Sequence, residues 1–168
     1  MTGTDARKVS RRVALCGLLL ALMLVLGFFE SLLPSGSIPG IKLGLSNGVL
    51  IFAVYLLGIP TAAALMVLKV LLSGFLFGGV SAMLYAFAGG VLSLLVMSLL
   101  SRVKGLHPVT VSMMGGAAHN VGQVGMAMLM LQTKQLLYYM AVLILVGLAC
   151  GALTGVCANA VMRRWIKR

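Results

Sequence analysis

Six long apolar runs alternate along the chain with short breaks rich in polar residues, glycine or proline. A transmembrane helix needs roughly 20 mainly apolar residues, and clustered Pro, Gly or polar residues interrupt it. The first break, residues 34–42, has the sequence PSGSIPGIK, which is typical of a structured loop. The pattern predicts six helices, over residues 13–33, 43–57, 61–77, 82–100, 111–131 and 136–162.

The amino-acid composition indicates that these helices lie in lipid. Of the 168 residues, 61% are hydrophobic and 9% charged, with a mean hydropathy of +1.14, whereas a soluble domain is about one quarter charged. A cleaved signal peptide is the alternative for the first run, but that run is longer than a secretory apolar region of roughly 7–15 residues. We therefore expect an all-α integral membrane protein, with residues 1–168 forming one transmembrane domain.

The distribution of basic residues predicts the topology. The net charge of +11 could suggest a nucleic-acid partner, but that would require a continuous basic face. With six helices, one side receives ten basic residues, and the other receives only Lys42 and Lys134. The ten are Arg7, Lys8, Arg11, Arg12, Arg102, Lys104, Arg163, Arg164, Lys167 and Arg168. Both termini are therefore expected in the cytoplasm of a multi-pass plasma-membrane protein that binds no nucleic acid.

Few residues could support catalysis. Asp5 and Glu30 are the only acidic residues, so carboxylate cages for several metal ions are excluded. The cysteines Cys16, Cys150 and Cys157 lie in apolar runs without a Cys-x-x-Cys motif, so neither a disulfide framework nor a zinc site is expected. No Walker loop or Gly-x-Ser-x-Gly motif is present. We expect no catalytic residues, no metal and no enzyme activity.

Lys69 is the first candidate binding residue, because it lies near the centre of the third predicted span. A lysine at such a position costs about 2.5–3.5 kcal/mol on insertion scales. Snorkelling to an interface is the alternative, but about eight residues, or about 12 Å, separate it from either helix end. Lys69 is therefore expected to face a polar cavity or to pair with an anion.

A second candidate cluster lies in the fifth predicted helix. His119 and Gln123 are four residues apart and share a helical face, and Asn120 is adjacent. These side chains could simply hydrogen-bond a neighbouring helix. Their association with flanking glycines favours a ligand contact, and one histidine alone is a poor metal site.

The first loop and the entry to the second helix supply two further candidates, Lys42 and Asn47. Lys42 could bind a ligand or anchor the chain to lipid headgroups. Glu30 could be the counter-ion of Lys42 or Lys69, or a solvated helix end, and the sequence does not choose between these roles.

Small residues at regular spacing predict close helix contacts. Gly147, Gly151 and Gly155 recur every four residues and are expected to pack inside the bundle. In the first helix Ala14, Gly17 and Ala21 could instead face an external partner.

Four stretches resemble the Gx transporter family, which is labelled heptaprenyl diphosphate synthase component I and is similar to substrate-binding (S) components of energy-coupling factor transporters. They are PGIKLGLSN at 39–47, LKVLLSGFLFG at 68–78, YAFAGGVLS at 85–93 and GAAHNVGQ at 116–123, in matching order over nearly the whole chain. Position 69 departs from the family pattern, which usually has Arg there. Lysine keeps the charge but not the bidentate geometry.

The resemblance implies six helices with cytoplasmic termini and a small-molecule pocket near the extracellular side. It also implies a transmembrane coupling protein, docked on Ala14, Gly17 and Ala21, and two cytoplasmic ATPases. ATP would be used by those partners, with no cofactor in this chain. Prenyl diphosphate synthases bind Mg²⁺ through aspartate-rich motifs, and this chain has one aspartate, Asp5.

The leading hypothesis is therefore a substrate-capture subunit of an uptake transporter. The alternative is a non-catalytic membrane subunit that accompanies an isoprenoid, prenyl diphosphate or quinone-related enzyme. A lone secondary carrier is less favoured, because the chain is small and lacks a clear internal repeat.

Overall fold

The computed structural model describes residues 3–32 and 44–166. Lys42 and the rest of the 34–42 segment lie outside this range. The described residues are helical apart from short connections, and they contain no strand, so the prediction of an all-helical chain is confirmed. The elements are α1 (Gly3–Leu32), α2 (Asn47–Leu57), α3 (Ile59–Ser73), the π-helical turn η1 (Gly74–Gly78), α4 (Gly79–Leu100), α5 (Pro108–Leu131) and α6 (Leu136–Ile166).

Two helices differ most from the predicted runs, because α1 is longer and α2 is shorter than expected. α1 begins ten residues before the apolar run, because its basic first turns are good helix formers although they are not apolar. α2 has only 11 residues, so it is about 16 Å long, roughly half the ~30 Å hydrocarbon thickness of a bilayer. The run predicted at 43–57 therefore contains a half-length helix, whose first turn lies at depth within the molecule.

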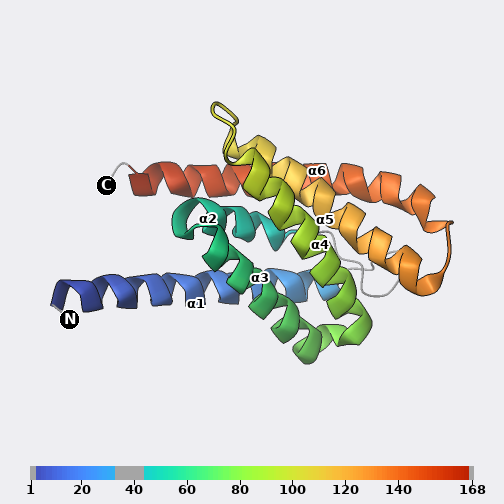
Figure 1. Cartoon of the computed structure of the whole chain (residues 1–168), viewed down its shortest axis with the longest axis horizontal. Helices are drawn as coiled ribbons and strands as arrows, with labels where there is room; N and C mark the ends of the chain where they lie inside the picture. The colour runs from blue at the N-terminus through green and yellow to red at the C-terminus, as the bar shows by residue number, and fades with distance from the viewer. Residues whose placement is uncertain (1–2, 33–43, 167–168) are drawn as a thin grey trace.

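Within the residues that the structure describes, three helical stretches are long and apolar enough to cross a membrane: residues 5–32, 59–100 and 136–164. The second contains α3, η1 and α4, which form a hairpin in Figure 1. α5 is not among the three. Its 24 residues are long enough, but it carries the buried polar side chains His119, Asn120 and Gln123.

The helices form an elongated bundle with both termini at one end (Figure 1). α1 and α6 run in opposite directions along its length, and the shorter helices fill the space between them. The turn between α2 and α3 is made by Gly58, whose φ of 86° is a left-handed conformation that favours glycine. Arg12 ties this turn to α1, because its Nη2 donates to the carbonyl of Leu57 (3.0 Å) and the hydroxyl of Thr61 (3.1 Å).

The tightest seam lies between α5 and α6. A Cβ at Gly147 would lie 2.7 Å from the carbonyl oxygen of Gly116, and one at Gly151 would lie 2.6 Å from that of Ser112. A Cβ at Gly155 would lie 2.9 Å from Cα of Val109. These distances are too short for any larger residue. The glycines of α6 therefore let two backbones meet inside the bundle, as their spacing predicted.

Polar and apolar residues are distributed opposite to the pattern of a soluble domain. Gln123 and Glu30 are 0% and 1% exposed, whereas Phe75 and Leu129 are 82% and 77% exposed. Large exposed apolar surfaces are unfavourable in water, and charged groups inside a helical bundle are costly unless they are functional or paired. The arrangement is that of a membrane protein whose outer surface is solvated by lipid.

Candidate binding site

Most of the buried polar side chains come from α5 and from the segments that meet it. α5 contributes four, and the others lie on α1, at the start of α2, and on α3 and α4. In the part of the chain that the structure describes, the set is Glu30, Ser46, Asn47, Lys69, Ser73, Ser93, Ser112, His119, Asn120 and Gln123.

The middle of α5 presents two polar groups in different directions. The Gln123 side chain is hydrogen-bonded to the His119 ring, from Nε2 to Nε2. A primary-amide nitrogen only donates, so the imidazole Nε2 is the acceptor in this pair. Asn120, about 100° further round the helix, turns toward α6, where its Nδ2 donates to the carbonyl of Leu143 (2.6 Å). These bonds orient both side chains before any ligand binds.

Gly44 brings the start of α2 against this part of α5. Its φ is 86°, and a Cβ there would lie 3.3 Å from Cδ2 of His119. The same point lies 3.6 Å from Nδ2 of Asn47 and 3.9 Å from Oδ1 of Asn120. The positive φ favours glycine, and a Cβ would press against the His119 ring. Asn47, a separate candidate in the sequence, is thereby placed beside the α5 cluster.

Two amide atoms in this junction are unsatisfied. Within the residues that the structure describes, Nδ2 of Asn47 and Oδ1 of Asn120 are buried and have no hydrogen-bond partner. The same holds for the hydroxyls of Ser46 and Ser93 within that part of the chain. A buried polar atom without a partner costs about 1–3 kcal/mol, so these atoms offer one donor and one acceptor, besides two hydroxyls, to a bound molecule.

α4 closes the cluster on a further side. A Cβ at Gly89 would lie 2.6 Å from the His119 carbonyl oxygen and 2.9 Å from Nδ1 of its ring. Only a residue without a side chain lets α4 approach this closely. Gly44, Ser46, Gly89 and Ser93 were not identified as site residues from the sequence. The sequence did contain a signal for these residues, because all four lie in glycine-containing stretches that resemble the family.

Glu30 and Lys69 lie where α1 meets α2 and α3. The Glu30 carboxylate accepts a hydrogen bond from the backbone N–H of Leu45, just before the first turn of α2. A carboxylate is favoured there, because helix N-termini carry partial positive charge. Glu30 is 1% exposed, so the solvated-end interpretation is wrong. Cε of Lys69 lies 3.8 Å from the position that a Cβ would take at Gly27, one turn before Glu30.

The predicted residues thus fall into three places. Asn47, His119, Asn120 and Gln123 form the junction around Gly44, and Lys69 lies against α1. Convergence of Lys69 with the α5 cluster stays a prediction, and Lys42 lies outside the described residues. Ala14, Gly17 and Ala21 are exposed on α1, and a Cβ at Gly17 would meet nothing within 4 Å.

The donor set favours an organic ligand over a metal ion. In residues 3–32 and 44–166, no three His, Cys, Asp or Glu side chains gather closely enough to hold a metal. The junction offers amides, hydroxyls and a single imidazole. Such groups recognise the hydrogen-bonding edges of a small molecule.

Comparison with known proteins identifies one family. A family model described as heptaprenyl diphosphate synthase component I matches residues 19–161. This range includes every candidate binding residue and, in α1, Ala21. No match was found among curated proteins or among solved structures.

Proposed function

Because the chain belongs to the heptaprenyl diphosphate synthase component I family, we propose that it is the substrate-binding membrane subunit of an energy-coupling factor type uptake transporter. The observation that carries the proposal is the pair of buried, unsatisfied amide atoms on Asn47 and Asn120 beside Gly44. A site that holds oriented polar groups ready in a dry interior is suited to bind a small molecule. The ligand presents an acceptor to Asn47 and a donor to Asn120.

Capture occurs from the extracellular side, with both termini in the cytoplasm of a plasma-membrane protein. The first turns of α1 and the last turn of α6 contain basic residues, and these two helix ends lie at the same end of the bundle (Figure 1). The connection containing Arg102 and Lys104 lies near the same part of α6, because Nε2 of His107 is 3.4 Å from Nδ2 of Asn159. Collected positive charge favours the cytoplasmic face.

The transport energy comes from partners. A transmembrane coupling protein docks on Ala14, Gly17 and Ala21, and two cytoplasmic ATPases hydrolyse ATP. This chain binds no cofactor and catalyses no reaction, since a prenyl diphosphate synthase would need aspartate-rich Mg²⁺ motifs and Asp5 is the sole aspartate. The buried charges of Glu30 and Lys69 serve ligand binding and assembly with the partner proteins.

The family description supports a second candidate, a non-catalytic membrane subunit of a prenyl diphosphate or quinone-related enzyme. In that case the junction binds part of an isoprenoid substrate for a separate catalytic subunit. The proteins that copurify with the tagged chain discriminate the two. A coupling protein with ATPases supports the transporter, and a prenyltransferase supports the alternative.

Asn47→Ala tests the binding site. Asn47 Nδ2 has no partner within the described residues, so its removal breaks no protein hydrogen bond there while leaving a ligand acceptor unpaired. We expect binding to weaken by about 1–3 kcal/mol with an unchanged melting temperature, and His119→Ala and Gln123→Ala to weaken it similarly. The measurement is mass spectrometry of small molecules released from gently solubilised protein, per mole of protein.

Ser98→Ala is the matched control, because its hydroxyl donates to the carbonyl of Leu94 within α4 (2.6 Å). It should retain the ligand. Equal ligand content in wild type and Asn47→Ala would contradict a site at this junction.

A further inference from the structure

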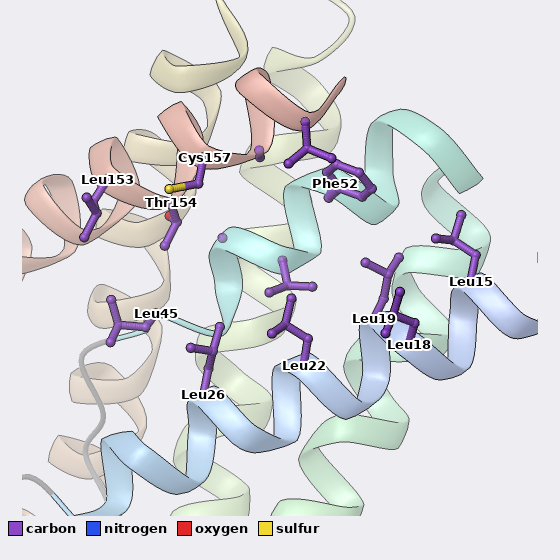
Figure 2. A pocket seen from close by; sticks show the side chains of 14 residues that line it. Leu15, Leu18, Leu19, Leu22, Leu26, Leu45, Phe52, Leu153, Thr154 and Cys157 are labelled. Carbon is purple, nitrogen blue, oxygen red and sulfur yellow. The ribbon is translucent and has the colours of Figure 1, made fainter. Parts of the chain in front are cut away.

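A long apolar groove runs along α1 on the side facing α2 and α6. It has a volume of about 540 Å³, and Figure 2 shows leucines of α1 directed toward side chains of α2 and α6. The α1 side is lined by Leu15, Leu18, Leu19, Leu22 and Leu26. Thr154 is the one hydroxyl in the lining, and it already donates to the carbonyl of Cys150 (2.8 Å). The groove therefore suits an apolar chain.

A basic cavity adjoins one end of the groove. This second cavity, of about 350 Å³, is lined by Lys8, Arg11, Arg12, Leu15, Leu56 and Leu57. Leu15 lines both cavities, so they adjoin at this residue. The bonds of Arg12 to Leu57 and Thr61 hold the basic pocket open beside the end of α2. An apolar groove beside a basic cavity is complementary to an amphiphile with an anionic headgroup.

The length of the groove selects the kind of amphiphile. From Leu15 to Leu26 the helix rises about 16 Å, close to half of the ~30 Å hydrocarbon core. One acyl chain of one leaflet matches this length, whereas a heptaprenyl chain is much longer. In residues 3–32 and 136–166 no Cα atom of α1 lies within 8 Å of one of α6, so the two backbones are held apart along the groove.

We propose that this groove is a binding site for an anionic phospholipid, with one acyl chain between α1 and α6 and its phosphate against Lys8 and Arg11. The groove borders the segment of the Gly44 junction at Leu45 and Gly48, but the proposal stands independently of the proposed transport function. It lies in the leaflet at the end of the molecule that holds both termini. The bound lipid completes the packing of α1 against the bundle.

The test is native mass spectrometry of the full chain, reconstituted with phosphatidylcholine and phosphatidylglycerol in equal amounts and then extracted in mild detergent. Wild type should retain one phosphatidylglycerol with about tenfold preference, because both lipids offer a phosphate but Lys8 and Arg11 repel the choline cation of phosphatidylcholine. Lys8→Gln/Arg11→Gln should abolish the preference. The control Arg102→Gln/Lys104→Gln removes the same charge outside the groove and should keep it.

A second pair of variants tests the acyl-chain site. Leu22→Trp fills the groove and should reduce retention of both lipids at least tenfold, whereas Val25→Trp, on the same helix but outside the lining, should not. Should Leu22→Trp lower the melting temperature, Leu18→Trp, at a more exposed lining position, replaces it.

Three results overturn the proposal. The first is an equal loss of preference in the Arg102/Lys104 control, which indicates general surface attraction. The second is unchanged retention in a folded groove-filling variant. The third is displacement of phosphatidylglycerol by an equal concentration of a polyprenyl diphosphate, which assigns the groove to another amphiphile.

Discussion

At the scale of single residues, Glu30 and Lys69 carry the buried carboxylate and ammonium groups of the described chain. Both lie over one face of α1, since Cε of Lys69 lies next to Gly27 and Glu30 follows one turn later. Lys69 was expected to pair with an anion, and Glu30 lies on the same face of α1. Glu30 also accepts a hydrogen bond from the backbone N–H of Leu45, so this face of α1 is tied to the segment that enters the Gly44 junction.

Lys69→Met should destabilise the protein, because it removes a buried positive charge from the face of α1 on which the Glu30 carboxylate is buried. Breaking a buried ion pair by removal of one partner costs about 3–5 kcal/mol. Lys69→Met/Glu30→Gln should recover most of that loss. Thermal unfolding in detergent of the two single variants and the double variant measures the coupling. A stable Lys69→Met that fails only to bind an anionic ligand would instead assign Lys69 to the ligand.

At the scale of helices, two stripes of small residues have opposite environments. Gly147, Gly151 and Gly155 of α6 meet the backbone of α5. Ala14, Gly17 and Ala21 of α1 are exposed, on a face that adjoins the groove at Leu18. Small residues allow two helix backbones to approach closely. No described helix packs on these three residues of α1. This face is the surface we assign to the coupling protein.

Gly17→Leu and Ala21→Leu should weaken copurification of the coupling protein while leaving the melting temperature and ligand content unchanged. The added side chains enter open space in this chain but prevent close approach by a partner helix. Gly151→Leu is the contrasting variant. Its Cβ would lie 2.6 Å from a backbone oxygen of α5, and overpacking of this kind costs about 1–3 kcal/mol or more. Wild-type copurification by both α1 variants would show that this face contacts lipid alone.

At the scale of the whole molecule, the bundle places both termini at one end (Figure 1). The connection between α4 and α5 carries Arg102 and Lys104, and the connection between α5 and α6 carries Lys134. Since α5 separates these connections, they should lie on opposite sides of the membrane.

Cysteine labelling tests this topology in a background that lacks Cys16, Cys150 and Cys157. Lys134→Cys should react with an impermeant reagent added to intact cells, and Lys104→Cys should react only after the membrane is opened. The positive-inside bias is the physical reason. Equal labelling of position 104 in intact cells would exclude cytoplasmic termini in a six-span arrangement.

The sequence by itself determined the all-helical, lipid-solvated class and the approximate place of each helix. Both follow from local composition: apolar runs of sufficient length require helices in lipid, and glycine, proline and polar breaks end them. It also identified the polar residues of α5, because such residues stand out in an apolar helix. The sequence did not identify Gly44 and Gly89, because the role of a glycine depends on which neighbouring group packs against it.

Tertiary structure alone decided which of these features meet. It placed Asn47 beside His119 and Asn120, put Lys69 on the Glu30 side of α1, and left α2 at half length. It also directed one stripe of small residues inward and left the other exposed, although their spacing is alike. The reason is that local pattern sets the face of a helix, whereas contact between faces depends on how every helix packs in three dimensions.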